Sequence, residues 1–339
     1  MEFGVFDHMD RKDMPLGQQY EERLRLVELY ERAGFYAYHL AEHHSTPLGM
    51  APSPSVFLAA VAQRTSRLRF GSLVYPLPFH HPLRAAEEIS MLDQMSGGRL
   101  EVGVGRGSSP HELEYYGIVP GEAQARYFEA FAILRQALTS RFVDFDGRFY
   151  KFKNVPIELE PVQKPHPPFW YGVGSPDGMT WAAQNGINVV CNGPTSLVKT
   201  VTERYRSEWK RGGGKPDELP FVAMNRFVVI AETDQRALQI AERGYRHWHA
   251  KFFHLWNQRG LQPAYATYPD TFGQLIDLGY GVAGSVETVR ETLSSQIEQA
   301  DNNYLVGRFA FGDLTLEEST TSVQLFTSDV MPALRKAAA

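Results

Sequence analysis

The sequence predicts a (β/α)8 barrel, and three observations support this fold class. Short apolar runs alternate with helical patterns along the whole chain, as they do where each parallel strand leads into a helix. No Pro- or Ser-rich linker separates these units. The length of 339 residues suits one large α/β barrel. A doubly wound sheet joined to a second domain is the alternative that fits the same alternation.

The predicted strands are short apolar runs, and helix boundaries show characteristic signals. Strands are expected at 3–6, 36–41, 68–75, 100–105, 167–173, 187–192, 221–231 and 303–311. Helices are expected at 18–33, 54–63, 83–95, 123–139, 177–184, 197–209, 234–256, 286–299 and 316–334, with a loop at 110–120. Gly34 and Gly97 follow helical segments, where glycine commonly ends a helix. Pro54 stands at an early position of another helix.

Two segments interrupt this alternation. Asp146-Gly147 lies between two aromatic, alternating runs in 142–152, which is the signature of a β-hairpin. Residues 258–283 are rich in Gly, Pro and Tyr and have weak periodicity, so we interpret them as a long excursion or lid. The chain is therefore expected to form one barrel domain over 1–339, with excursions at about 142–166 and 257–284.

Composition and charge argue against several classes of protein. With 43% hydrophobic and 22% charged residues, the chain can bury a large core. A formal net charge of −5 argues against nucleic acid or an anionic membrane as a partner. Cys191 is the only cysteine, so no internal disulfide can form and a reducing compartment is expected. The first residues do not resemble a signal peptide, and no apolar run has the length of a membrane span. A cytoplasmic protein is expected.

A carboxylate and two imidazoles end the second predicted strand. Glu42, His43 and His44 follow the run 36–41, and the carboxyl ends of barrel strands are where such folds keep their chemistry. Neighbouring strand residues point to opposite faces, so only one of the two histidines is expected to point straight into the site. An ordinary polar strand end is the blander alternative. A metal site is a third, but no complementary ligand spacing supports it.

Glycines accompany polar residues after the fourth and fifth strands. Arg106 lies in a Gly-Val-Gly-Arg-Gly turn, where the backbone can approach a ligand and the guanidinium can match a phosphate. A surface ion pair is the alternative for this arginine. Gly174 and Ser175 precede the next helix, where free N–H groups can bind an anion. Ser175 can equally be an ordinary N-cap.

Two further groups of residues have open interpretations. Asp7 and His8 end the first predicted strand, so by geometry they face the barrel mouth, either as substrate or proton-network residues or as surface polarity. Residues 247–256 place a stripe of His, Trp and Phe side chains on the longest helix. Packing against the barrel or a partner subunit is favoured for this stripe over a substrate-binding wall.

A set of short motifs spans nearly the whole chain. They are Ala41-Glu42-His43-His44, His81-Pro82, Leu92-Asp93-Gln94-Met95-Ser96-x-Gly98-Arg99, Gly103-x-x-Arg106-Gly107, Trp181-Ala-Ala-Gln184-x-Gly186 and Phe326-x-Ser328-Asp329-Val330-Met331-Pro332. In this order they resemble the bacterial-luciferase-like family of flavin-dependent monooxygenases. The resemblance implies a (β/α)8 barrel that receives reduced flavin mononucleotide (FMN) from a separate flavin reductase. It further implies that oxygen forms a C4a-peroxyflavin, which oxidises an organic substrate, and that the chain forms a homodimer.

The resemblance also assigns roles near the flavin ring. His43 corresponds to an acid/base histidine, with His44 and Glu42 as its support. An imidazole suits this role because it ordinarily titrates near neutrality. Leu73 and Val74 correspond to residues that contact the ring, where the family has a non-prolyl cis peptide bond.

For the flavin phosphate, the resemblance points to Arg106, Arg126, Gly174 and Ser175. Arg126 corresponds to a second phosphate-binding arginine of the family. Where some relatives have a glutamate and a threonine, this chain has Gly174 and Gly178. Fewer side-chain contacts to the phosphate are therefore expected here.

The leading functional hypothesis is a monooxygenase that oxidises an apolar small molecule with reduced FMN and O2. One alternative is a deazaflavin-coenzyme-dependent dehydrogenase of the same fold, but such relatives usually have Asp-His where this chain has Glu42-His43-His44. Another is a non-catalytic flavin-binding protein, which the presence of the histidines disfavours. A barrel hydrolase lacks support because the sequence has no nucleophile elbow or metal triad.

Overall fold

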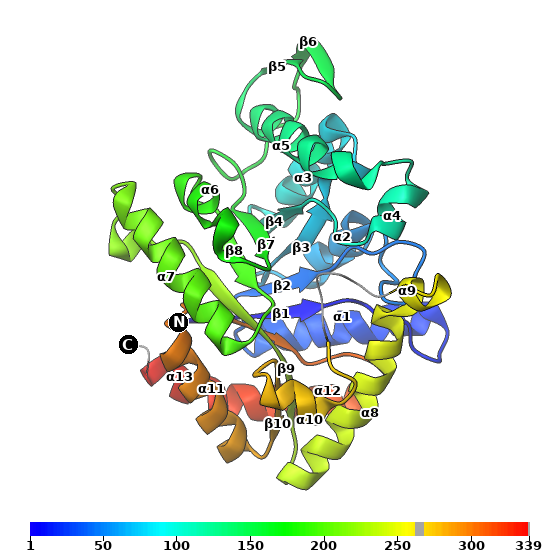
Figure 1. Ribbon diagram of the computed structural model, residues 1–339, viewed down its shortest axis with the longest axis vertical. Helices are drawn as coiled ribbons and strands as arrows, with labels where there is room; N and C mark the ends of the chain where they lie inside the picture. The colour runs from blue at the N-terminus through cyan, green and yellow to red at the C-terminus, as the bar shows by residue number, and fades with distance from the viewer. Residues whose placement is uncertain (262–267, 338–339) are drawn as a thin grey trace.

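The computed structural model describes residues 1–261 and 268–337, which form a closed barrel of parallel strands surrounded by helices (Figure 1). Around the ring the strands follow in the order β1-β2-β3-β4-β7-β8-β9-β11. The pairing of β8 with β9, and of β11 with β1, closes the ring. The predicted (β/α)8 barrel is confirmed, and the doubly wound sheet is excluded.

The predicted strands and helices correspond to elements of the structure. The barrel strands are β1 (Glu2–Asp7), β2 (Ala37–Leu40), β3 (Arg69–Pro76), β4 (Leu100–Gly105), β7 (Phe169–Val173), β8 (Asn188–Cys191), β9 (Val222–Ile230) and β11 (Tyr304–Arg308). The main helices are α1 (Leu16–Arg32), α2 (Pro54–Arg64), α3 (Pro82–Ser96), α5 (Ala123–Thr139), α6 (Met179–Gln184), α7 (Thr195–Arg211), α8 (Asp234–Phe252), α11 (Val286–Ala300) and α12 (Leu316–Leu325).

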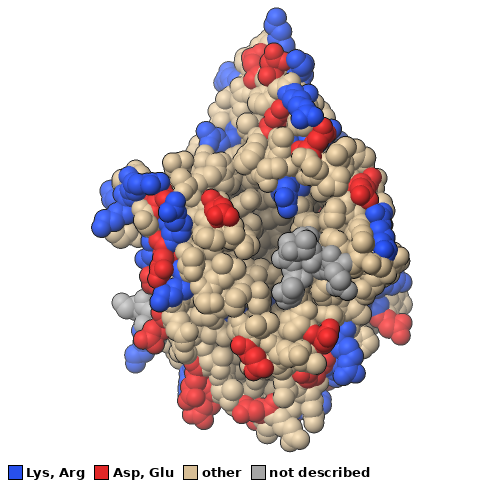
Figure 2. Space-filling model, viewed as in Figure 1, with Lys and Arg blue, Asp and Glu red and all other residues tan. Residues whose placement is uncertain are grey.

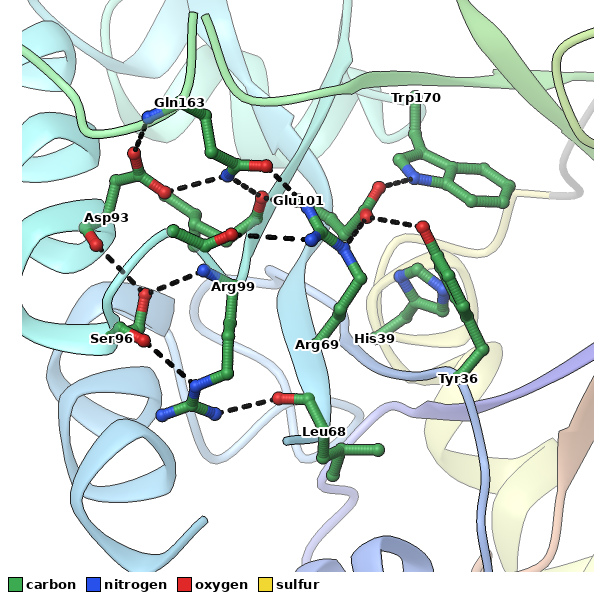
Figure 3. Close-up of polar contacts among 12 residues, drawn as sticks. Tyr36, His39, Leu68, Arg69, Asp93, Ser96, Arg99, Glu101, Gln163 and Trp170 are labelled. Carbon is green, nitrogen blue, oxygen red and sulfur yellow. Dashed lines mark hydrogen bonds and ion pairs between the residues drawn. The ribbon is translucent and has the colours of Figure 1, made fainter. Parts of the chain in front are cut away.

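The amino-terminal end of the barrel is filled by a polar network around Glu101 of β4 (Figure 3). This buried carboxylate accepts hydrogen bonds from Trp170 Nε1 at 2.5 Å and the Tyr36 hydroxyl at 3.1 Å, and it pairs with Arg69. Burial raises the pKa of Glu101, although the Arg69 charge and the three donors oppose that change. A functional site is therefore to be sought at the carboxyl ends of the strands, where barrels bind their ligands.

Three helical regions differ from expectation. The predicted loop at 110–120 contains α4 (Pro110–Tyr115), whose N-cap Ser109 accepts a hydrogen bond from the backbone N–H of Glu112. The predicted helix at 234–256 is split into α8 and α9 (His254–Gln258). The closing helix continues from α12 through a π-helical turn, Phe326–Val330, into α13 (Met331–Ala337). In the described ranges, none of the helices combines the length and apolarity that crossing a membrane requires.

The two expected excursions differ in character. Strands β5 (Phe142–Asp146) and β6 (Lys151–Pro156) form the predicted antiparallel hairpin, which projects from the top of the molecule in Figure 1. In the second, α10 (Phe272–Asp277) and β10 (Gly281–Gly284) are built into the fold, since β10 pairs with β9. Phe272 and Leu275 are fully buried, so this part is not a free lid. Residues 262–267 of the excursion lie outside the described residues.

Candidate active site

We call the stretch of β7 around Gly172 and Gly174 the open wall of the barrel mouth, because neither residue has a side chain. Figure 2 shows the surface hollowed near the middle of the view, in the region where Figure 1 shows β2, β3 and β7. Gly172 in β7 and Gly174 directly after it are exposed. A Cβ atom added to either glycine would meet no atom of the described residues within 4 Å. This wall therefore leaves room for a ligand against its backbone.

His43 is oriented by a buried carboxylate that the sequence analysis did not single out. Its Nδ1 lies 3.2 Å from Oε1 of Glu112, and the same oxygen accepts the backbone N–H of His44 at 2.8 Å. Burial favours a higher pKa for Glu112, but the His43 charge, its hydrogen bond and the His44 N–H lower the pKa overall. An ionised carboxylate only accepts hydrogen bonds, so Nδ1 carries the shared proton. Nε2 of His43 is then the nitrogen left to exchange protons.

Glu42 and the His44 side chain belong to a separate network. Oε1 of Glu42 accepts hydrogen bonds from His44 Nε2 at 2.9 Å and from His80 Nε2 at 2.7 Å. The Tyr116 hydroxyl lies 2.8 Å from the other ring nitrogen of His44. Burial alone would lower the pKa of His80, but its hydrogen bond to Glu42 and that negative charge raise the pKa overall. The support that these residues give His43 is indirect, since they fix the segment that carries it.

The side chains of Asp7, the last residue of β1, and of His8, which follows it, point to opposite faces of the strand. Asp7 points away from the mouth, where its Oδ2 lies 3.0 Å from Arg23 Nε and accepts a hydrogen bond of 3.0 Å from the Tyr38 hydroxyl. Asp7 therefore joins β1 to α1 and β2 and is not a site residue. The next side chain, His8, faces the mouth.

His8 provides a neutral ring beside His43. The two imidazoles are stacked with ring centres 5.6 Å apart. The indole N–H of Trp248 donates to His8 Nδ1 at 3.3 Å, so this nitrogen is unprotonated. Burial, followed by the charges of Arg308 and His43, holds the pKa of His8 well below its ordinary value. Trp248, one residue of the aromatic stripe at 247–256, thus reaches the mouth. The stripe mainly packs against the body of the protein, as expected.

Leu73 and Val74 lie on β3 beside the open wall. The peptide bond between them is cis, as the resemblance implied. A Cβ atom at Gly105 of β4 would come within 2.6 Å of Val74 Cγ2. Glycine at this position therefore admits the Val74 side chain between the two strands.

Arg106 presents a free guanidinium at the rim. Its side chain is exposed, and its Nε donates only to the carbonyl of Gly107, at 3.3 Å. Within the described ranges it forms no ion pair. Arg106 directly follows β4, the strand that pairs with β7. This geometry suits binding of an anion and does not support the surface ion-pair alternative.

Arg126 and Ser175 are partly occupied by carboxylates. Arg126 Nη2 lies 3.5 Å from Glu122, and its guanidinium lies 4.3 Å from the ring centre of Phe149. Its Nε is buried without a hydrogen-bond partner. The Ser175 hydroxyl donates to Asp177 at 2.9 Å. An incoming phosphate would compete with these carboxylates, so Arg106 is the better placed of the expected phosphate-binding side chains.

The part of the mouth formed by β8, β9 and β11 carries polar residues that were not singled out from the sequence. Arg308, the last residue of β11, donates to Asn225 Oδ1 and Asn192 Oδ1, each at 3.0 Å. Each of the three lies on, or directly after, a barrel strand. A polar residue on a predicted barrel strand is the sequence feature that could have identified them as site candidates. Over residues 1–261 and 268–337, no group of three or more His, Cys, Asp and Glu side chains is arranged to hold a metal ion.

The fold and the mouth define a (β/α)8-barrel enzyme with an oriented imidazole at the carboxyl ends of its strands. Residues 1–300 match the family described as luciferase-like monooxygenase. The chain belongs to this family, and it is an enzyme of the monooxygenase class that the motifs predicted.

Known relatives and structures support this assignment. The uncharacterized protein y4wF of Sinorhizobium fredii is 43% identical over 97% of this chain and 96% of its own length. The oxygenase component of the flavin-dependent trigonelline monooxygenase of Acinetobacter baylyi is 29% identical over 70% of this chain and 67% of its own. The structure of monooxygenase RslO1 from Streptomyces bottropensis has a TM-score of 0.88 at 27% identity, covering 98% and 99% of the chains.

A more distant structure shows the same fold. The oxygenating constituent of the 3,6-diketocamphane monooxygenase of Pseudomonas putida, solved with FMN, has a TM-score of 0.81 at 20% identity. It covers 98% of this chain, and 98% of that chain is covered.

Proposed function

We propose that this protein is the oxygenase component of a two-component flavin-dependent monooxygenase. A separate flavin reductase supplies reduced FMN, which with O2 provides the oxidising chemistry through a C4a-peroxyflavin. The substrate is a mainly apolar small organic molecule. The observation that carries the proposal is the His43–Glu112 pair, because it directs the proton to Nδ1 and leaves Nε2 without a hydrogen-bond partner among the described residues.

The residues at the open wall fit an aromatic cofactor with a phosphate. Gly172 and Gly174 leave space against β7, and Leu73 and Val74 provide an apolar surface for a flavin ring. Arg106 is exposed and free of carboxylates, so it is assigned to the phosphate. Gly174 and Ser175, with Arg126, complete the phosphate site if Asp177 and Glu122 give way.

His43 is assigned as the acid/base residue. Its Nε2 would give a proton to, or take one from, the reacting oxygen or the substrate. Glu112 fixes which nitrogen is available, and the neutral ring of His8 shields one face of the imidazole. His44 and Glu42 keep the segment in place through His80.

A titration under anaerobic conditions tests the cofactor assignment. Reduced FMN should bind saturably, and the reduced deazaflavin coenzyme should bind much more weakly. Tight binding of the deazaflavin coenzyme alone would establish the dehydrogenase alternative instead. The F420-dependent secondary alcohol dehydrogenase structure, with a TM-score of 0.74 at 18% identity, shares the fold and does not decide the cofactor.

We also propose that the chain forms a homodimer through α2 and α3. Val56 on α2 and Met91 and Met95 on α3 are large apolar side chains that are exposed. Exposed apolar side chains on neighbouring helices are typical of a protein–protein interface.

A further inference from the structure

Arg308 is a buried cation in an apolar setting. It is 3% exposed and continues the inward-facing series of β11, after Tyr304 and Val306 of the barrel interior. Its guanidinium carbon lies 4.4 Å from the ring centre of Phe227 and 4.9 Å from that of Phe6. Aromatic faces stabilise a cation, but they do not neutralise it.

This cation has no counter-charge among its described neighbours. Its hydrogen bonds go to the neutral amide oxygens of Asn225 and Asn192. The Tyr268 hydroxyl also lies against the guanidinium, and it is itself hydrogen bonded to Asn192 Nδ2. Nη1 of Arg308 is buried, and among residues 1–261 and 268–337 it has no hydrogen-bond partner. A buried charge without a partner is costly, so the unpaired donor calls for an explanation, and a bound ligand is one.

Other buried arginines of the barrel have partners that Arg308 lacks, although Nε and Nη2 of Arg23 are also without a hydrogen-bond acceptor among the described residues. Arg23 lies 3.0 Å from the carboxylate of Asp7. Arg226 has no carboxylate, but each of its three nitrogens donates, to Gln296, to the carbonyls of Gly193 and Asn225, and to Thr195. Arg308 alone of these three lacks both a carboxylate and a full set of acceptors. The spare donor therefore suits one oxygen atom of a negatively charged group.

The position of Arg308 connects it to the proposed chemistry. In the ring of eight strands, three strands separate β11 from β4 on either side, so Arg308 faces the end of β4, which leads to Arg106. Its charge acts on His8, which stacks on His43. The mouth thus has two cationic side chains, Arg106 after β4 and Arg308 at the end of β11. The strand that leads to His43, β2, lies midway between β4 and β11 around the ring.

We propose that the substrate of this enzyme carries an anionic oxygen group, a carboxylate or a phenolate, that binds Nη1 of Arg308. The rings of Phe6, Phe227 and Trp248 surround the guanidinium and keep its setting apolar. This inference rests on the proposed function and specifies its substrate class: a mainly apolar molecule with one acidic oxygen. The bound oxygen supplies the counter-charge that the protein itself lacks.

Calorimetric titration of the flavin-free protein tests the proposal with named probes. Benzoate should bind the wild type about tenfold or more tightly than its neutral isostere benzamide, because a hydrogen bond to a charged group is worth that much. The preference should disappear in Arg308→Gln and persist in Arg106→Gln. 4-Nitrophenolate, used above its pKa, replaces benzoate in a second arm and tells a phenolate site from a carboxylate site.

Equal binding of benzoate and benzamide by the wild type would overturn the proposal, and this comparison needs no variant to fold. A preference that survives in Arg308→Gln, or that is lost in Arg106→Gln, would overturn it as well. Reduced FMN is titrated separately into wild type and Arg308→Gln, with unchanged affinity expected. Failure of the wild type to bind reduced FMN would contradict the proposed function, whereas loss of the benzoate preference alone contradicts only the substrate class.

Discussion

Glu112 decides which nitrogen of His43 can act. The carboxylate binds Nδ1 and the His44 backbone N–H together, so Nε2 keeps a fixed direction. A ring held in this way can transfer protons repeatedly without turning, whereas a free ring would lose its alignment.

Replacing His43 tests the acid/base assignment. His43→Ala should slow substrate oxidation by about 10²-fold or more, since a positioned acid/base group contributes 10²–10⁴-fold. Reduced FMN affinity should hardly change, because the expected flavin contacts lie on β3, β4 and β7. Stopped-flow turnover and anaerobic titration measure the two effects, and His247→Ala on the outer surface of α8 is the matched control. Turnover equal to that of the wild type would remove His43 from the chemistry.

Arg106 carries the expected affinity for the flavin phosphate. Arg106→Ala should weaken the binding of reduced FMN by about 1–3 kcal/mol, through the loss of a charge-assisted contact. Fluorescence titration under anaerobic conditions measures the change. Arg25→Ala, at an exposed position on α1, should have no effect. If Arg106→Ala binds reduced FMN as tightly as the wild type does, the phosphate lies elsewhere.

Some residues of the candidate site were predicted from the sequence, and others were not. His43 and Arg106 were predicted because each follows a strand beside a recognisable motif. Glu112 was missed because it lies in a segment without clear periodicity and meets His43 across 69 positions of the chain. Arg308 was missed because one arginine at a strand end looks ordinary until its missing counter-charge is visible.

His80 and Glu42 join the segment before α3 to the end of β2. The folded-state pKa of His80 is raised by Glu42 overall, against the effect of burial. A raised folded-state pKa means that the pair contributes its full stability below the unfolded-state pKa of about 6.5. That contribution is lost as the pH rises through the higher folded-state pKa.

Thermal unfolding as a function of pH measures this link between elements. The melting temperature of the wild type should fall, relative to that of His80→Gln, as the pH rises above about 6.5. His247→Gln, which alters an exposed histidine, should follow the wild type throughout. Parallel curves for wild type and His80→Gln would show that the pair does not stabilise the fold.

At the scale of elements, apolar periodicity was enough to predict every barrel strand. It missed α4, because that helix is short and is held mainly by its Ser109 cap and its contacts across the mouth. It also missed the integration of α10, whose buried Phe272 and Leu275 lie in a segment otherwise rich in Gly, Pro and Tyr. Tertiary contacts decide such short elements, and local sequence records them weakly.

The proposed homodimer concerns the molecule as a whole. Met91→Glu with Met95→Glu should shift the protein from dimer to monomer, because two charges would be buried at the interface. Light scattering after size-exclusion chromatography measures the mass. Leu238→Glu, at an exposed apolar position on α8, should leave the dimer intact. A wild type that is already monomeric would remove the dimer from the account.

The barrel was predictable because its alternation runs through the whole chain, whereas the mouth assembles residues from many separate strands. The glycines of β7 and Arg106 after β4 occupy one part of the mouth, and Arg308 lies on β11, across the ring from β4, with its asparagine partners on β9 and directly after β8. This division suits a cofactor that faces a substrate across His43, and it is the arrangement that the proposed oxidation requires.

Rapid mixing with oxygen tests whether the protein stabilises an oxygenated form of the bound flavin. The anaerobic complex with reduced FMN is mixed rapidly with oxygenated buffer while the flavin absorbance is recorded. We predict a long-lived oxygenated flavin spectrum, distinct from those of reduced and oxidised FMN. Conversion straight to oxidised FMN, at the rate seen for free flavin, would contradict the account.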